Sequence, residues 1–87
     1  MTEAEMLQRW MAVADELGLL FAHQPDEKVV ASLARMRQNL IDKFCALFPN
    51  AERETMAAGV DSIMRHIQDR KCEIERYAIT ADRSKSN

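Results

Sequence analysis

The side chains that most often bind metals or act as nucleophiles are scarce in this chain, which has two cysteines and two histidines in 87 residues. Zinc sites usually show paired ligands at short spacing, and His23, His66 and Cys45 are far apart in sequence. Cys72 and His23 are the one pair expected at a similar level of the fold. A histidine that follows a helix, where a positive charge interacts favourably with the helix dipole, explains His23 better. The sequence therefore predicts no metal site and no cofactor.

The two thiols show no sign of a shared function. Cys45 and Cys72 form no CxxC motif. In a helical bundle, a rise of about 1.5 Å per residue would separate them by roughly 25 Å, which is too far for a disulfide bond. We interpret them as small apolar side chains in a reducing compartment, and the reactivity of each stays an open question.

Carboxylates are frequent, but their spacing does not suit acid–base catalysis. The adjacent pairs Asp15-Glu16 and Asp26-Glu27 would point about 100° apart on a helix, so the two members of a pair would not face one substrate. The sequence also contains no GxSxG, HExxH or phosphate-loop motif. We therefore expect a protein that is not an enzyme.

Charge and hydropathy argue against nucleic acid and membrane partners. The net charge is −2, and residues 1–24 carry four acidic residues against one basic residue. Phosphate binding depends on a strong basic excess, which no segment has, so nucleic acid is not the expected partner. Residues 1–5 lack a basic leader segment, and no apolar run approaches the roughly 18 to 20 residues that span a bilayer. These features predict a cytoplasmic protein.

Three long stretches carry apolar residues at intervals of three and four, which is the spacing of an amphipathic helix. They predict helices over residues 3–22, 25–48 and 51–79, separated by breaks around Pro25 and Pro49. Thr2 and Glu5 match a capping box at the first helix. Gly18 either ends that helix or lies inside it at a cost of about 1 kcal/mol.

Short links between long helices favour antiparallel neighbours, so the fold class expected is an all-α, three-helix antiparallel bundle. Residues 1–80 should form a single helical domain, and the small polar residues 81–87 should form a flexible C-terminal tail. The expected core includes a near end with Met6, Leu7, Trp10, Phe44, Leu47, Phe48, Met56 and Val60. Its middle should hold Val13, Ala14, Met36, Leu40, Ile63 and Ile67, and its far end Leu17, Leu20, Phe21, Val29, Val30, Leu33, Ile74 and Tyr77.

Size and apolar content together suggest an interaction protein. A chain this short buries only about 60 to 65% of its extended surface, and self-association is a common remedy, so a homodimer is expected. The apolar run from Phe44 to Phe48 covers every side of its helix, which is more than one bundle readily buries. We expect a regulator, anti-activator, chaperone or adaptor that presents an apolar helix face, with Trp10, Met11, Phe44 and Phe48 as candidate partner-binding residues.

The alternative is a nucleic-acid-associated regulator that uses a basic stretch of the third helix. Arg65, Arg70 and Lys71 are the candidate contacts in that stretch, which also contains acidic residues. The competing interpretation is an ordinary solvated face with intrahelical ion pairs such as Lys71 with Glu75. The partner's identity, the oligomeric order and a swap of the first helix between protomers stay open.

Overall fold

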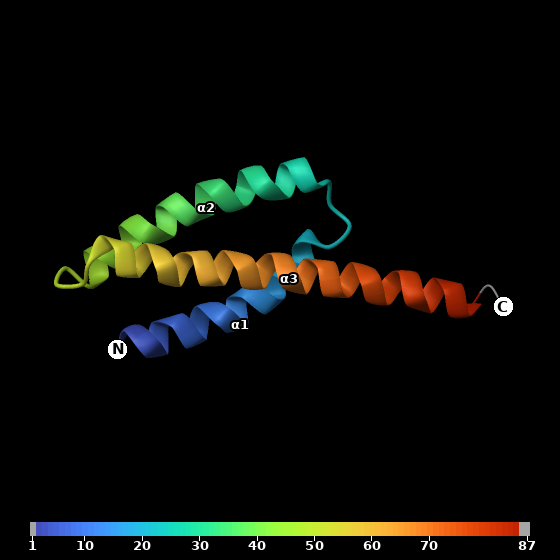
Figure 1. Ribbon diagram of the computed structural model, residues 1–87, viewed down its shortest axis with the longest axis horizontal. Coiled ribbons are helices and arrows are strands. Elements are labelled where there is room, and N and C mark those ends of the chain that lie inside the picture. The colour runs from blue at the N-terminus through green and yellow to red at the C-terminus, as the bar shows by residue number, and fades with distance from the viewer. Residues whose placement is uncertain (1, 86–87) are drawn as a thin grey trace.

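The structure, a computed structural model, describes residues 2–85 and the side chains of residues 2–77, and it contains three helices and no strand in that range. Helix α1 covers Glu3–Phe21, α2 covers Asp26–Leu47 and α3 covers Arg53–Lys85. The long α3 runs between the other two in Figure 1, and both pack against it. The predicted all-α three-helix bundle is confirmed.

The helix ends follow the capping signals of the sequence. The Thr2 hydroxyl accepts a hydrogen bond from the backbone N–H of Glu5 at 3.2 Å, as the capping box predicts. Pro25 is the cap of α2, so the helix begins one residue later than predicted. Before α3 the Ala51 N–H donates to the Phe48 carbonyl, and this turn delays the start of the helix to Arg53.

The largest boundary error concerns the end of α3, which was predicted at residue 79 and lies at Lys85. After Gly59 the chain contains neither glycine nor proline, so no residue interrupts the helix. Residues 81–85 of the predicted tail therefore continue α3. Residues 86 and 87 of that tail lie outside the described residues.

Helix α3 supplies the centre of the core. Its Val60, Ile63 and Ile67 are completely buried. The helix α1 contributes Ala14 and Met6, and the other buried apolar residues are Val29, Leu33, Leu40, Ile41, Phe44, Met56 and Met64. The middle and near layers of the bundle are thus largely as the sequence predicts.

The predicted far layer is wrong for three residues. Leu20, Val30 and Tyr77 are 66%, 58% and 79% exposed. Leu47, which was predicted to be buried at the near end, and Val13, which was predicted in the middle, are also exposed. Figure 1 shows that α3 continues beyond the far ends of α1 and α2, so its C-terminal part has no neighbouring helix within the described residues. Helical spacing marks an apolar face, but it does not say how much of that face a neighbouring helix covers.

Gly18 lies inside α1 and is buried, which decides between the two alternatives left by the sequence. A Cβ atom at this position would lie 2.6 Å from both Cβ and Cγ of Arg70 and 3.1 Å from the Ile67 carbonyl oxygen. The absence of a side chain at Gly18 therefore lets the aliphatic stem of Arg70 pack against α1. This contact explains how an arginine occupies a position on α3 where the apolar pattern predicts a core residue.

Candidate functional site

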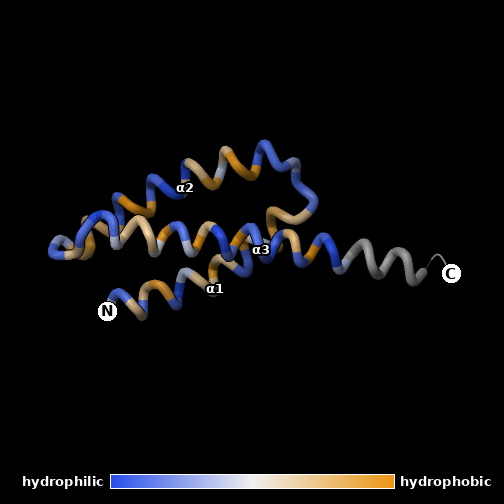
Figure 2. Tube along the Cα trace, in the orientation of Figure 1, coloured by the Kyte–Doolittle hydropathy of each residue, from blue (hydrophilic) through white to orange (hydrophobic). Residues whose placement is uncertain are grey.

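An open groove lies between α1 and α2. It is lined by Trp10 of α1 and by six residues of α2, namely Ser32, Arg35, Met36, Asn39, Leu40 and Lys43. The lining positions on α2 recur at intervals of three and four, so they form one face of that helix. Figure 2 shows that polar and apolar residues alternate along α2, as expected for a helix that is only partly covered.

The apolar part of the groove combines a fixed aromatic ring with an adaptable thioether. Trp10 packs against the buried Phe44, with ring centroids 6.3 Å apart and a tilt of 59°. Leu40 is buried at the base, and Met36 is half-buried beside it. Tryptophan adds large contact area and methionine adjusts to irregular shapes, so this combination suits a protein partner.

The apolar surface continues along α1 beyond the groove. Val13, Leu17 and Leu20 follow Trp10 at intervals of three, four and three, which places the four residues on one face of the helix. We call these four residues the α1 stripe. Val13 is 39% exposed, Leu20 is largely exposed and Leu17 is half-buried. Val13 and Leu20 therefore extend the exposed apolar surface from Trp10 along α1.

The polar part of the groove is cationic. Arg35 and Lys43 lie on its α2 side, and no carboxylate is among the residues that line it. Within the described part of the chain, neither cation forms a hydrogen bond or an ion pair. The groove therefore presents two uncompensated positive charges beside an apolar surface.

Other cations of the same region are paired with carboxylates. Arg37 of α2 donates to Asp61 of α3 at 2.5 Å, and Arg53 donates to Asp42 at 2.9 Å. The hydrogen bond from Arg37 lowers the pKa of Asp61, and the one from Arg53 lowers the pKa of Asp42. Both pairs join α2 to α3. Their charges are satisfied within the chain.

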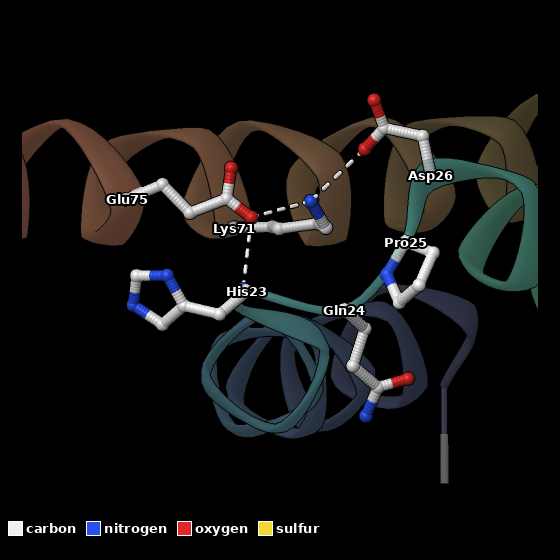
Figure 3. Close-up of a pocket in the computed structure, with 6 residues that line it drawn as sticks. All are labelled: His23, Gln24, Pro25, Asp26, Lys71 and Glu75. Atoms are coloured by element: carbon white, nitrogen blue, oxygen red, sulfur yellow. Dashed lines mark hydrogen bonds and ion pairs between the residues drawn. The ribbon is translucent and has the colours of Figure 1, made fainter.

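A second polar cluster joins the α1–α2 loop to α3 (Figure 3). Lys71 is 4% exposed, and its ammonium donates to Glu75 at 2.5 Å and to Asp26 at 3.2 Å. The backbone N–H of His23 donates to the same Glu75 oxygen at 2.9 Å. The hydrogen bond between Lys71 and Glu75 raises the pKa of Lys71 and lowers the pKa of Glu75. The hydrogen bond from the His23 N–H lowers the pKa of Glu75 further.

This cluster holds the α1–α2 loop against α3. His23 has a positive φ of 68°, a conformation that few residues other than glycine and asparagine adopt readily, and its N–H bond to Glu75 stabilises the turn. The His23 imidazole points away from the Lys71 ammonium in Figure 3. The one cation here has two carboxylate partners, so we interpret the cluster as structural.

The structure separates the partner-binding candidates of the sequence into two regions. Trp10 lies in the groove, Met11 is half-buried against the core, and Phe44 is buried beneath Trp10. Phe48 is half-buried and, together with Phe44, lines a small apolar pocket at the near end of the bundle. Of the aromatic candidates, Trp10 alone therefore lines the groove.

The basic candidates all lie on α3 and are not brought together with Trp10. Arg65 is exposed, Arg70 is half-buried and pairs with Glu73 at 3.3 Å, and Lys71 is buried in its cluster. Arg35, Met36 and Lys43 were not among the predicted candidates. Their spacing on one face of α2 is the signal that would have indicated them, and the one acidic residue near that face is Asp42, seven positions after Arg35.

The remaining chemistry-bearing residues also lie apart. His66 of α3 shares a 2.6 Å hydrogen bond with Asp15 of α1, while Cys72 is exposed and Cys45 is half-buried, both as free thiols. Among the described residues, no group of three or more histidine, cysteine or acidic side chains is arranged to hold a metal ion. None of the helices in that range has the length and apolarity needed to cross a membrane.

Comparisons with protein-family models, curated proteins and solved structures find no match to this chain. The groove, the α1 stripe and the charges beside them are the features from which a function can be inferred.

Proposed function

We propose that the protein is a small, non-enzymatic protein–protein interaction module, of the kind found among regulators, adaptors and chaperones, that holds a helical segment of a partner in the α1–α2 groove. The observation that carries this proposal is the uncovered apolar surface formed by Trp10, Met36 and the α1 stripe. An apolar surface bordered by polar residues is a common feature of binding sites for proteins.

The shape of the surface favours a helix as the bound element. The lining of α2 from Ser32 to Lys43 extends over about 17 Å, which matches about three turns of a helix. A helix in this position would lie along two helices that already flank a third, and would complete a four-helix arrangement. Its apolar face would cover Trp10, Met36 and Val13.

The nucleic-acid alternative has less support. Lys71 is buried between two carboxylates and Arg70 pairs with Glu73, so two of its three candidate contacts are already engaged. Phosphate binding draws its affinity from cations that are free to replace counterions. The basic stretch of α3 therefore resembles a solvated face with internal ion pairs.

Trp10 is the single tryptophan of the chain, so its fluorescence reports directly on the groove. The test is a titration with synthetic amphipathic helical peptides that contain a leucine face and no tryptophan. We expect a saturable shift of Trp10 emission to shorter wavelengths, because a bound helix removes water from the indole. A peptide of the same composition in scrambled order is the control. The absence of a shift with every amphipathic peptide would contradict the proposal.

A pair of variants tests whether the peptides bind in the groove. Met36→Ala should weaken binding about tenfold, because we expect this central apolar contact to contribute about 1 to 2 kcal/mol. Val30→Ala is the matched control, since Val30 is an exposed apolar residue of α2 that lies outside the groove lining. Equal affinities for the two variants would show that the peptides bind elsewhere.

A further inference from the structure

We infer that the groove prefers helices that carry acidic residues about two turns apart along the edge that faces α2. This inference rests on the proposed function and adds the charge and orientation of the bound segment. It follows from the placement of Arg35 and Lys43 and from the absence of carboxylates among the residues that line the groove.

The first step concerns the availability of the two cations. Arg37 and Arg53 are held by carboxylates of their own chain, whereas Arg35 and Lys43 have no such partner among the described residues. Charges placed at the edge of an apolar surface attract complementary partners and reject those of like charge. Arg35 and Lys43 are therefore available to a carboxylate supplied from outside.

The second step concerns spacing. Arg35 and Lys43 are eight positions apart on α2, which corresponds to about 12 Å along the helix axis. A bound helix that runs beside α2 presents side chains on one edge at intervals of about seven residues, or roughly 10.5 Å. Two acidic residues at that interval would reach both cations at once. Asn39 lies between the two cations in sequence and lines the groove. Its uncharged amide can donate a hydrogen bond to a polar side chain of the bound helix.

The third step concerns the opposite side of the groove. The α1 stripe is bordered by Arg9 and Glu16, each of which is three or four positions from Val13. The charges of these two residues cancel, but α1 as a whole carries four acidic residues and one basic residue, so acidic groups on the edge of the bound helix that faces α1 would be disfavoured. The preference for acidic residues therefore applies to the α2 side alone, and it fixes which edge of the bound helix is acidic.

Three peptides with one leucine seam test the inference. They carry two glutamates, two glutamines or two lysines at an interval of about seven residues on the same edge. With Trp10 emission as the readout, the glutamate peptide should bind about tenfold tighter than the glutamine peptide, and the lysine peptide should bind least. The differences should shrink in about 1 M salt, where the Debye length is near 3 Å.

Charge reversal tests whether Arg35 and Lys43 are the source of the preference for acidic peptides. The double variant Arg35→Glu with Lys43→Glu should invert the order of the three peptides. Arg65→Glu is the control, because Arg65 is an exposed cation of α3 that does not line the groove. Circular dichroism of each variant confirms that the helices are retained, as expected for substitutions of exposed or groove-facing side chains.

The outcomes separate the two proposals. Equal affinity of the three peptides would overturn the acidic preference and leave the helix-binding groove intact, whereas no emission shift with any peptide would overturn both. An inversion of the order by Arg65→Glu would also overturn the inference, because it would place the relevant charge on α3. Tighter binding of a single-stranded oligonucleotide than of the glutamate peptide would contradict it as well.

Discussion

At the scale of single residues, the contact between Gly18 and Arg70 shows what a small side chain allows. The apolar spacing alone would have favoured a hydrophobic residue at Arg70, and Gly18 alone would have been compatible with a helix end. The structure shows that the two irregularities compensate each other, because the arginine stem fills the space that glycine leaves. Neither position could be interpreted from the sequence without the packing of α1 on α3.

Gly18→Ala should therefore destabilise the protein even though alanine is favoured over glycine inside a helix by about 1 kcal/mol. The new Cβ would lie too close to the rigid first part of the Arg70 side chain. We expect the free energy of unfolding in urea to fall by about 1 to 3 kcal/mol.

Gly59→Ala is the matched control for this substitution. Its Cβ would lie 3.1 Å from a terminal methyl carbon of Leu7, which can move by rotation of its side chain. We expect the free energy of unfolding to stay the same or to rise by up to about 1 kcal/mol. Equal losses at the two glycines would show that Gly18 is not a special contact between α1 and α3.

At the scale of helices, α2 is attached to α3 by a short row of buried side chains. Leu33, Leu40 and Phe44 are each less than 5% exposed, and the spacing of apolar residues predicted all three as core. What the sequence could not predict is the angle at which α2 leaves α1. Leu20 and Val30 are exposed and a groove lies between α1 and α2, because each of these helices packs mainly on α3 and only in part on the other.

Leu40→Ala should lower the free energy of unfolding by about 2 to 5 kcal/mol, because it leaves a cavity under the groove. Leu47→Ala is the control, since Leu47 lies on the same helix but is 53% exposed. Urea unfolding followed by circular dichroism gives both values. A similar, small loss for the two variants would mean that α2 does not pack through Leu40.

The Lys71 cluster attaches the N-terminal end of α2 to α3 through Asp26. It should make the free energy of unfolding depend on pH. The hydrogen bond from Lys71 lowers the pKa of Glu75 in the folded state below its usual value of about 4.3. The stabilisation by Glu75 is therefore complete above that usual value, and it is lost as the pH falls through the lowered value.

Glu75→Gln should accordingly lower the urea midpoint at pH 7, because the buried Lys71 ammonium loses a charged partner. The difference from the unmodified protein should shrink as the pH falls below about 4.3, where Glu75 becomes protonated in the unfolded chain, and it should vanish below the lowered pKa of the folded state. Glu73→Gln is the control, because the pair of Glu73 with Arg70 lies at the surface. A loss at pH 7 that persists undiminished at pH 3 would contradict this role of the Glu75 charge.

At the scale of the whole molecule, the sequence predicted the class and order of the elements but only part of the candidate site. Trp10 was identified because it belongs to the near-end group of large apolar residues, which was expected to exceed what one bundle readily buries. Arg35 and Lys43 were not identified, because the sequence does not show which cations of α2 and α3 form ion pairs. The structure shows that Arg37 pairs with Asp61 and Arg53 with Asp42. The homodimer expected from the size of the chain stays a prediction, and sedimentation over a range of concentrations would test it.

Binding of a helix in the groove should also stabilise the whole bundle, because it would hold α1 and α2 in a fixed relation. A ligand that binds only the folded state at 100 times its Kd adds about 2.7 kcal/mol to the free energy of unfolding. Thermal unfolding with and without the glutamate peptide measures this gain. An unchanged melting temperature at saturation would show that the peptide does not bind the folded protein selectively.

The most direct test of the central claim is a map of amide and indole chemical-shift changes as the glutamate peptide is added to the isotope-labelled protein. The account predicts the largest changes at Trp10, Met36 and Lys43, with small changes at Lys71 and Glu75. Changes centred on the basic stretch of α3, or none along the groove at peptide concentrations that saturate binding, would contradict it.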